Sequence, residues 1–248
     1  MITVDQAEVE REVKRLAPWY YLYDLQGVRT DSTPAFDQYG HRTVNVPTWC
    51  ERYFKGRSVL DVGCNEGAYS FSALDRGAAK VVGFDCREAN VEKARFVARV
   101  NGRVNASFEI GSADNWPLQP QYDIVLLCGL LYHLPKPWET IAHYCKIASQ
   151  HIFVRCVLCP WAFDDGYTPW KEGETIGASE KPAEEMSQYP SSLNTLRQEF
   201  AKHGFHPIVA REHYFGPDKG VRGILHRLRQ PKDKRYVNRG CFLFLTRK

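Results

Sequence analysis

The sequence predicts an α/β protein of the doubly wound, Rossmann-like class. From Ser58 onward, apolar segments with strand character alternate with segments in which apolar residues recur at helical intervals. A glycine-rich turn directly follows the first of these strands. Alternation of this kind produces a mostly parallel sheet with helices on both faces. We therefore expect a seven-stranded sheet that is mostly parallel with an antiparallel last strand, an N-terminal helical prelude and two inserts.

Each expected element has a local signature. The strands are expected at 58–62, 80–84, 106–110, 122–128, 151–157, about 206–214 and about 240–247. The helices are expected at about 67–76, 88–101, 136–147 and 192–203. In the second of these helices, Val91, Ala94 and Ala98 share one face. Asn101 and Gly102 then supply a natural end.

The first 50 residues are expected to form a prelude to the main domain. Thr3 and Gln6 have the spacing of a capping box, and an amphipathic helix then runs to the residue before Pro18. An aromatic cluster follows, and we interpret it as packing in preference to ligand recognition; it consists of Trp19, Tyr20, Tyr21 and Tyr23. We expect residues 1–50 to act as a lid.

Composition favours a cytoplasmic protein without disulfides. No apolar run approaches the roughly 18 residues of a membrane span, and the first residues are too polar for a signal peptide. The eight cysteines are scattered, as is typical of reduced thiols. Cys156 and Cys159 make a C-x-x-C pair, which without a second pair indicates packing more than a metal site. We therefore predict no metal and no membrane partner.

The expected main domain, residues 51–248, carries two inserts of opposite charge. Residues 160–190 hold seven acidic and two basic side chains, a net charge of −5. Residues 215–239 hold eight Lys or Arg and two acidic side chains, a net +6, in a chain of net +4. A basic excess confined to one segment argues against a surface-wide nucleic-acid binder and leaves a local phosphate contact open. The candidate contacts are Lys219, Arg222, Arg227, Arg229, Lys232, Lys234, Arg235 and Arg239.

The turn at residues 63–67 carries the strongest functional signal. Asp61-x-Gly63-x-x-x-Gly67 gives the backbone more freedom than a simple turn needs. In a doubly wound sheet, a ligand lies where the first strand turns into the first helix. A dinucleotide site would have the pattern G-x-G-x-x-G. Glu66 would put a negative charge near a pyrophosphate, so the turn favours a cationic ligand over a dinucleotide.

Carboxylates end two successive strands. Asp61 can receive an ammonium group, and Asp85 can accept hydrogen bonds from the hydroxyls of a ribose. Together they fit an amino acid joined to a nucleoside. Ser112 and the amide of Ala113 follow the third strand, where they are placed to flank an adenine.

Four motifs in this order resemble class I S-adenosylmethionine-dependent methyltransferases. They are LDVGCNEG, GFD, GSADNWP and YDIVLLCGLLYHL, and they span about residues 58–158. The segments LDVGCNEGAYSF, ARF at 94–96 and GLLYHLPKPWETI are similar to the branch that includes the tRNA wobble-uridine carboxymethyltransferase. Asn65 stands where this family usually has a middle glycine, and Ser112 stands where it often has an acidic residue. The chain is also shorter before the turn than that tRNA enzyme.

The resemblance implies S-adenosyl-L-methionine as the cofactor. The residues it implies for cofactor binding are Asp61, Gly63, Cys64, Asn65, Gly67, Asp85, Cys86, Ser112, Ala113 and Cys128. Tyr132 and His133 lie beside the expected methyl donor and are the candidate catalytic residues. His133 is either a general base or the cap of a helix that begins at Pro135. Tyr132 either packs in the core or lines the acceptor pocket.

The expected activity is methylation of an oxygen atom of a small molecule or glycan by direct displacement. The donor already carries its leaving group, so the protein mainly aligns the reactants and excludes water. Two alternatives stay open: methyl transfer to tRNA, and a regulatory protein that binds S-adenosylmethionine without catalysis. The sequence predicts neither the acceptor atom nor the oligomeric state.

Overall fold

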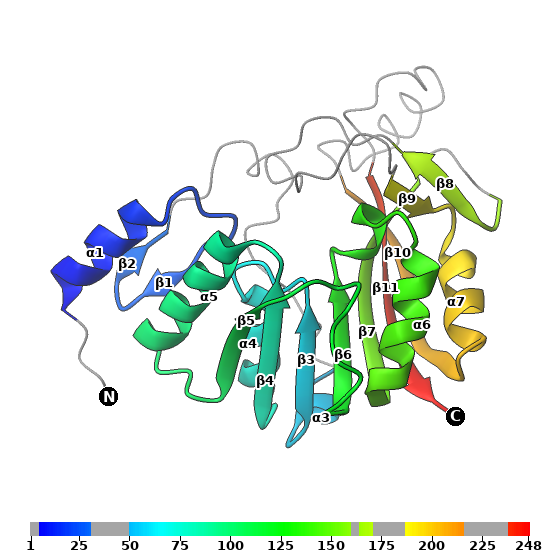
Figure 1. The fold of residues 1–248 in the computed structure, drawn as a ribbon, viewed down its shortest axis with the longest axis horizontal. Coiled ribbons are helices and arrows are strands. Elements are labelled where there is room, and N and C mark those ends of the chain that lie inside the picture. The colour runs from blue at the N-terminus through cyan, green and yellow to red at the C-terminus, as the bar shows by residue number, and fades with distance from the viewer. Residues whose placement is uncertain (1–4, 31–49, 160–163, 171–186, 216–237) are drawn as a thin grey trace. The chain divides into compact units, whose positions relative to one another are not determined.

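A computed structural model describes residues 5–30, 50–159, 164–170, 187–215 and 238–248 of the chain (Figure 1). The strands of its large sheet are β3 (Ser58–Val62), β4 (Lys80–Asp85), β5 (Ala106–Ile110), β6 (Tyr122–Cys128), β7 (Ala148–Leu158), β10 (Phe205–Phe215) and β11 (Asn238–Arg247). Their order is β10-β11-β7-β6-β3-β4-β5. Strand β11 pairs antiparallel with both β10 and β7, whereas β4 is parallel to β3 and β5, and β6 to β7. The predicted fold class, including the antiparallel last strand, is confirmed.

The chain divides into two compact units, Met1–Trp116 and Pro117–Lys248. The first contains β3, β4 and β5 together with helices α3 (Glu51–Phe54), α4 (Ala68–Asp75) and α5 (Glu88–Val100). Its core joins Phe71 of α4, Phe96 of α5 and Phe108 of β5, and the rings of Phe71 and Phe108 meet edge to face at 5.5 Å. The division of the chain between residues 50 and 51 remains a prediction.

The N-terminal segment packs within the first unit. Helix α1 (Gln6–Arg15) begins after Asp5, whose side chain accepts a hydrogen bond from the amide of Ala7. The expected Thr3–Gln6 capping box is therefore wrong, because Asp5 is the N-cap and Gln6 is the first helical residue. A tight hairpin that the sequence did not predict follows, formed by β1 (Asp24–Leu25) and β2 (Val28–Arg29).

The aromatic cluster of the prelude is largely packing, as predicted. Trp19 is 1% exposed, donates its indole N–H to the carbonyl of Val13 and packs against Phe96 of α5. Tyr21 is also buried, and Tyr23 meets the ring of Phe71 at 6.1 Å. These contacts attach the prelude to the core of the first unit.

The second unit builds on β6, β7, β10 and β11. Its helices are the short 3₁₀ helix η2 (Leu131–His133), α6 (Pro137–Ile147) and α7 (Leu193–Ala201). Ser192 caps α7 by accepting a hydrogen bond from the amide of Thr195. The acidic insert contributes a strand pair that was not predicted, β8 (Tyr167–Trp170) with β9 (Ser187–Pro190). Residues 171–186 of this insert and 216–237 of the basic insert lie outside the described residues.

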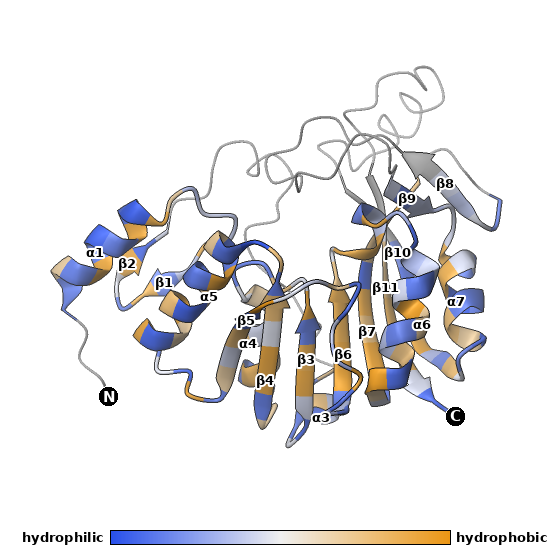
Figure 2. Cartoon of the chain, viewed as in Figure 1, coloured by the Kyte–Doolittle hydropathy of each residue, from blue (hydrophilic) through white to orange (hydrophobic). Residues whose placement is uncertain are grey.

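Apolar residues concentrate on the strands, as Figure 2 shows for β3, β4, β6 and β7. Their burial is nearly complete, because the β6 residues Ile124, Val125, Leu126 and Leu127 are all 0% exposed. Burying such side chains is the dominant stabilising contribution, about 1.5–3 kcal/mol for each. Within the described ranges, no helix is long and apolar enough to cross a membrane.

Gly67 offers a test of how tightly the first turn is packed. Its φ is +83°, and an added Cβ would lie 2.9 Å from ring atoms of both Phe71 and Phe108. We expect Gly67→Ala to lower the free energy of unfolding by about 1–2 kcal/mol for the left-handed backbone and a further 1–3 kcal/mol or so for overpacking. Urea unfolding measures the change.

Gly102 is the matched control for this substitution. Its φ is +61°, and an added Cβ would meet nothing within 4 Å. Gly102→Ala should therefore carry only the backbone cost of about 1–2 kcal/mol. Equal losses in the two variants would show that Phe71 and Phe108 do not restrict the turn.

Candidate functional site

The turn after β3 holds three residues in the left-handed region. Gly63, Asn65 and Gly67 have φ values of +66°, +51° and +83°. Asparagine tolerates this region better than almost any other residue with a side chain. Asn65 therefore keeps the left-handed backbone at the position where glycine is more usual.

Hydrogen bonds fasten this turn to the neighbouring strand. The amide of Cys64 donates to the carbonyl of Phe84 at 2.8 Å, and the amide of Asn65 donates to a carboxylate oxygen of Asp85 at 2.9 Å. Cys64 is itself buried, and burial raises the pKa of its thiol well above the ordinary value. The structure thus brings the turn and the end of β4 together; their role as one ligand site stays a prediction.

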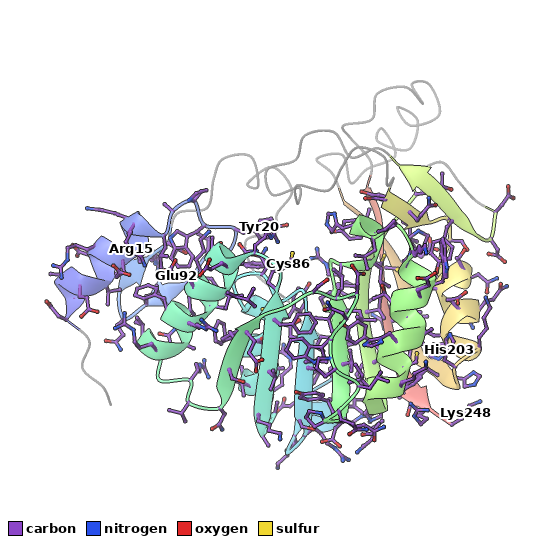
Figure 3. The ribbon with its side chains drawn as sticks, viewed as in Figure 1. Arg15, Tyr20, Cys86, Glu92, His203 and Lys248 are labelled. Carbon is purple, nitrogen blue, oxygen red and sulfur yellow. The ribbon has the colours of Figure 1, made fainter. Side chains whose placement is uncertain are left out.

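Asp85 is a buried carboxylate with several donors. Besides the Asn65 amide, it accepts from the backbone N–H of Arg87 at 3.0 Å, from its Nε at 3.1 Å, and from Nδ2 of Asn90 at 3.2 Å. The Arg87 side chain is 41% exposed, so its contact is the one a ligand hydroxyl can most readily exchange. Cys86, which follows, is exposed at the edge where β4 ends (Figure 3).

Asp61 is the more deeply buried of the two carboxylates predicted to bind the ligand. It is 1% exposed, and Oγ of Ser70 on α4 donates to its carboxylate at 2.6 Å. Burial raises the pKa of Asp61 to about 7, and the negative charge of Asp85 acts in the same direction. Among the described residues no cationic side chain pairs with Asp61. A ligand cation would therefore stabilise its ionised form.

Glu66 does not face a ligand, and this corrects the sequence interpretation. Its side chain is 1% exposed and accepts hydrogen bonds from the amides of Tyr20 and Tyr21, and Nζ of Lys93 lies 3.0 Å from it. Because Lys93 balances its charge, the predicted repulsion between Glu66 and a pyrophosphate is wrong. Its partners lie 27 to 46 residues away, and no local pattern indicates them.

The segment after β5 is organised by a residue that the sequence interpretation did not select. Trp116 stacks on Phe84 with ring centroids 3.9 Å apart and planes 3° apart. Ser112 accepts a hydrogen bond from the amide of Asp114 at 3.3 Å and so closes a local turn. Ser112 and Ala113 are half-buried beside it. The sequence signal that could have indicated this role of Trp116 is the presence of an aromatic residue a few positions after the strand.

The candidate catalytic residues lie in the second unit. Strand β6 ends at the buried Cys128, and the left-handed Gly129 leads into η2. The ring of Tyr132 lies 4.1 Å from that of the exposed His133 and 5.4 Å from that of Tyr189 on β9. Tyr189 was missed because its strand lies in an insert without a clear period.

The helix after His133 agrees with its expected range of about 136–147, but it begins two residues after Pro135, which was also named as its start. Its first residue is Pro137, its N-cap is Lys136, and the Lys136 side chain makes no capping hydrogen bond. The expected start at Pro135 is therefore wrong. The backbone N–H of His133 donates to the carbonyl of Leu130, within the 3₁₀ turn. The choice between general base and cap for the His133 ring remains a proposal.

Comparison with known proteins yields one family and several relatives. A family described as "Methyltransferase domain" matches residues 54–206. The tRNA U34 carboxymethyltransferase of Photobacterium profundum is 29% identical over 139 residues, 55% of this chain and 42% of that protein. A ubiquinone biosynthesis O-methyltransferase of Neisseria meningitidis serogroup A is 37% identical over 96 residues, 38% of this chain and 40% of that protein. The matches thus span about two fifths of the curated relatives.

A solved structure extends the likeness over the whole fold. The N-terminal domain of EvdMO1 with SAH bound has a TM-score of 0.70 at 19% identity, covering 99% of this chain and 98% of that one. The same domain in the presence of SAH and D-fucose has a TM-score of 0.68 at 18% identity, covering 99% and 97%. At these identities the likeness concerns the fold.

Proposed function

The chain belongs to the methyltransferase domain family, as a class I S-adenosylmethionine-dependent methyltransferase, and from this premise we propose that it methylates an oxygen atom of a small molecule or glycan. The observation that carries the proposal is the group of aromatic side chains at the end of β6. An exposed histidine there adjoins Tyr132, which in turn packs against Tyr189. Such a surface suits the flat, partly apolar face of a sugar or aromatic alcohol.

The first unit supports S-adenosyl-L-methionine as the donor. Asp61 is a buried carboxylate whose counter-ion would be the ammonium group of the methionine part. Asp85 has an exchangeable contact to Arg87 where ribose hydroxyls can bind. The left-handed turn between them shapes the backbone around the ligand. The carboxylates of Asp61 and Asp85, with the turn between them, therefore fit a ligand that carries an ammonium group and a ribose.

The chain's own residues have modest chemical tasks in this reaction. When bound, the donor supplies a methyl group that is already activated by its positive sulfur. Tyr132 and Tyr189 would orient the acceptor, and His133 would receive the proton of its hydroxyl. Its exposure lets the imidazole return that proton to water. Turnover of this kind distinguishes an enzyme from a regulatory protein that only binds the cofactor.

Two comparisons support an oxygen acceptor, and one supports an alternative. The ubiquinone O-methyltransferase acts, by its name, on an oxygen, and the EvdMO1 domain was solved in the presence of D-fucose. The tRNA U34 carboxymethyltransferase favours tRNA instead. The predicted phosphate contacts for tRNA include Arg227, Arg229, Lys234 and Arg235, which lie outside the described residues. We favour the small acceptor because the acidic insert would repel a polyanion.

We expect labelled S-adenosylmethionine to transfer its methyl group to a metabolite and glycan pool, and not to separate tRNA or protein pools. Chromatography of the labelled products identifies the acceptor class. Replacing Arg227, Arg229, Lys234 and Arg235 together by glutamine should leave this activity nearly unchanged, because a neutral acceptor releases no counterions. Label in tRNA, with steep salt dependence abolished by the fourfold change, would establish the alternative.

His133→Ala should lower kcat by roughly 10²–10⁴ and leave S-adenosylhomocysteine affinity near the wild-type value, because a general base acts only in the chemical step. Steady-state kinetics with the labelled acceptor measures kcat. His203→Ala is the control, since His203 lies at the opposite end of the second unit, where α7 has ended (Figure 3). An equal, small effect of both substitutions would remove His133 from catalysis.

Asp61 should make cofactor binding depend on pH. With its pKa near 7, the carboxyl must ionise to pair with an ammonium group, so binding releases a proton below that pH. We expect the affinity for S-adenosylhomocysteine to rise roughly tenfold between about pH 5.5 and 7, as calorimetry can measure. The α-amino group of the ligand stays protonated across this range, because the neighbouring carboxylate of a free amino acid makes it more basic than the α-amino group of a chain terminus, whose pKa is about 7.7–8.0.

Asp61→Asn is the control for this dependence, because it keeps the shape and the Ser70 contact but cannot ionise. Its affinity should be weaker and nearly flat over the same range. The raised pKa also means that the folded, ligand-free chain binds more protons than the unfolded chain between about pH 4 and 7, so its free energy of unfolding should fall as pH rises through that window. A flat wild-type binding profile would exclude the ammonium contact.

A further inference from the structure

Glu66 is an unusual residue for a ligand-binding turn, because its whole carboxylate is turned into the protein. The amide of Tyr20 lies 2.9 Å and 3.1 Å from its two oxygens, and the amide of Tyr21 lies 3.0 Å from one of them. Nζ of Lys93 on α5 lies 3.0 Å from the other oxygen. A buried charge needs this degree of pairing to persist.

The partners of Glu66 all belong to, or bind, the segment 18–23 of the prelude. Nζ of Lys93 also donates to the carbonyl of Pro18 and lies 5.5 Å above the ring of Trp19. The hydroxyl of Tyr23 donates to the backbone carbonyl of Glu66 at 2.7 Å. Both the side chain and the main chain of Glu66 therefore hold this segment.

The same residue lies inside the turn that the proposed function assigns to the cofactor. Its neighbours are Asn65, whose amide binds the Asp85 carboxylate, and the left-handed Gly67. Glycine and asparagine at left-handed positions leave such a turn with much freedom to lose when it binds a ligand. Contacts that hold the segment 18–23 also hold the turn in one conformation.

We propose that Glu66 is a positioning residue that fastens the segment 18–23 to the cofactor turn, so that docking of this segment and cofactor binding stabilise each other. The coupling is reciprocal by thermodynamic necessity: whatever the docked segment adds to cofactor affinity, the cofactor adds to docking. The inference rests on the proposed function for the identity of the cofactor. It adds a role for the prelude that the glycine turn alone does not imply.

The chain supplies a matched control. Arg15 of α1 and Glu92 of α5 form an ion pair of 2.6 Å between the prelude and the same helix that carries Lys93 (Figure 3). Both side chains are about half exposed, at 51% and 49%. Their hydrogen bond to each other joins α1 to α5 and does not involve the cofactor turn. Glu92→Gln thus removes one carboxylate from the prelude contact without touching the turn.

The experiment combines hydrogen exchange with calorimetry, using S-adenosylhomocysteine as the probe. In the wild type, the ligand should slow exchange at the amides of Tyr20 and Tyr21. In Glu66→Gln, these amides should lose their protection, and affinity should fall by about tenfold, within the 5- to 150-fold range typical of such coupling. Glu92→Gln should match the wild type in both measurements.

A second variant covers the case in which Glu66→Gln leaves Lys93 unpaired and does not fold. Glu66→Gln with Lys93→Met removes both charges of the buried pair, which is often nearly neutral for stability, and still removes the charged acceptor of the Tyr20 and Tyr21 amides. Lost protection together with weakened binding in this variant supports the coupling. The same double variant distinguishes a positioning role from a general effect on folding. A general effect would lower the melting temperature of the variant and leave the protection of these amides by the ligand unchanged.

Two results would overturn the inference, and they have different meanings. If a folded Glu66 variant loses protection at Tyr20 and Tyr21 but binds S-adenosylhomocysteine like the wild type, the segment docks independently of the cofactor. The proposed function would then stand. If the wild type itself does not bind the ligand, the proposed function fails, and the coupling fails with it.

Discussion

The hydrogen bond from the Asn65 amide to the Asp85 carboxylate is the contact on which the rest of the site depends. It joins the turn after β3 to the end of β4, two strands that already pair in parallel with Asp61 opposite Gly83. Within the turn, the amide of Gly67 donates to the carbonyl of Cys64 at 2.9 Å, and three of the five residues are left-handed. Further hydrogen bonds fasten the turn to β4 on one side and to the prelude on the other.

Three buried acidic residues of the first unit differ in the partners that compensate for the loss of water around their carboxyl groups. Asp85 is satisfied by amides and by Arg87, and Glu66 by two amides and the ammonium of Lys93. Asp61 has a serine hydroxyl, and burial therefore raises its pKa. A carboxyl left in that state is the one whose charge a ligand cation can still stabilise. Under the proposed function, Asp61 would therefore pair with a ligand cation and Asp85 would exchange its Arg87 contact for ribose hydroxyls, whereas Glu66 already has a full set of protein partners.

The features that could be predicted from the sequence are those that depend on residues close together in the chain. Strand and helix limits in the core agree with the structure within a few residues, because the alternation of apolar runs and the stops at Gly and Asn are local signals. The roles of Glu66, Trp116 and Tyr189 escaped prediction because each depends on a partner distant in sequence or on an insert with irregular pattern. The capping error has the same character: Thr3 and Asp5 both suit an N-cap, and only the position of the first helical turn selects Asp5.

Glu66 also shows why the net charge of a turn cannot be inferred from the amino-acid sequence of the turn alone. As an exposed carboxylate it would repel a pyrophosphate; paired with Lys93 it leaves little net charge at that point. We propose that discrimination against a dinucleotide comes from other residues of the turn. Asn65 stands where the G-x-G-x-x-G pattern has glycine, so its side chain would narrow the space for a close phosphate, while the buried Asp61 would favour a cation. In this proposal, shape at one residue and charge at another set the ligand class, and Glu66 holds the backbone on which both depend.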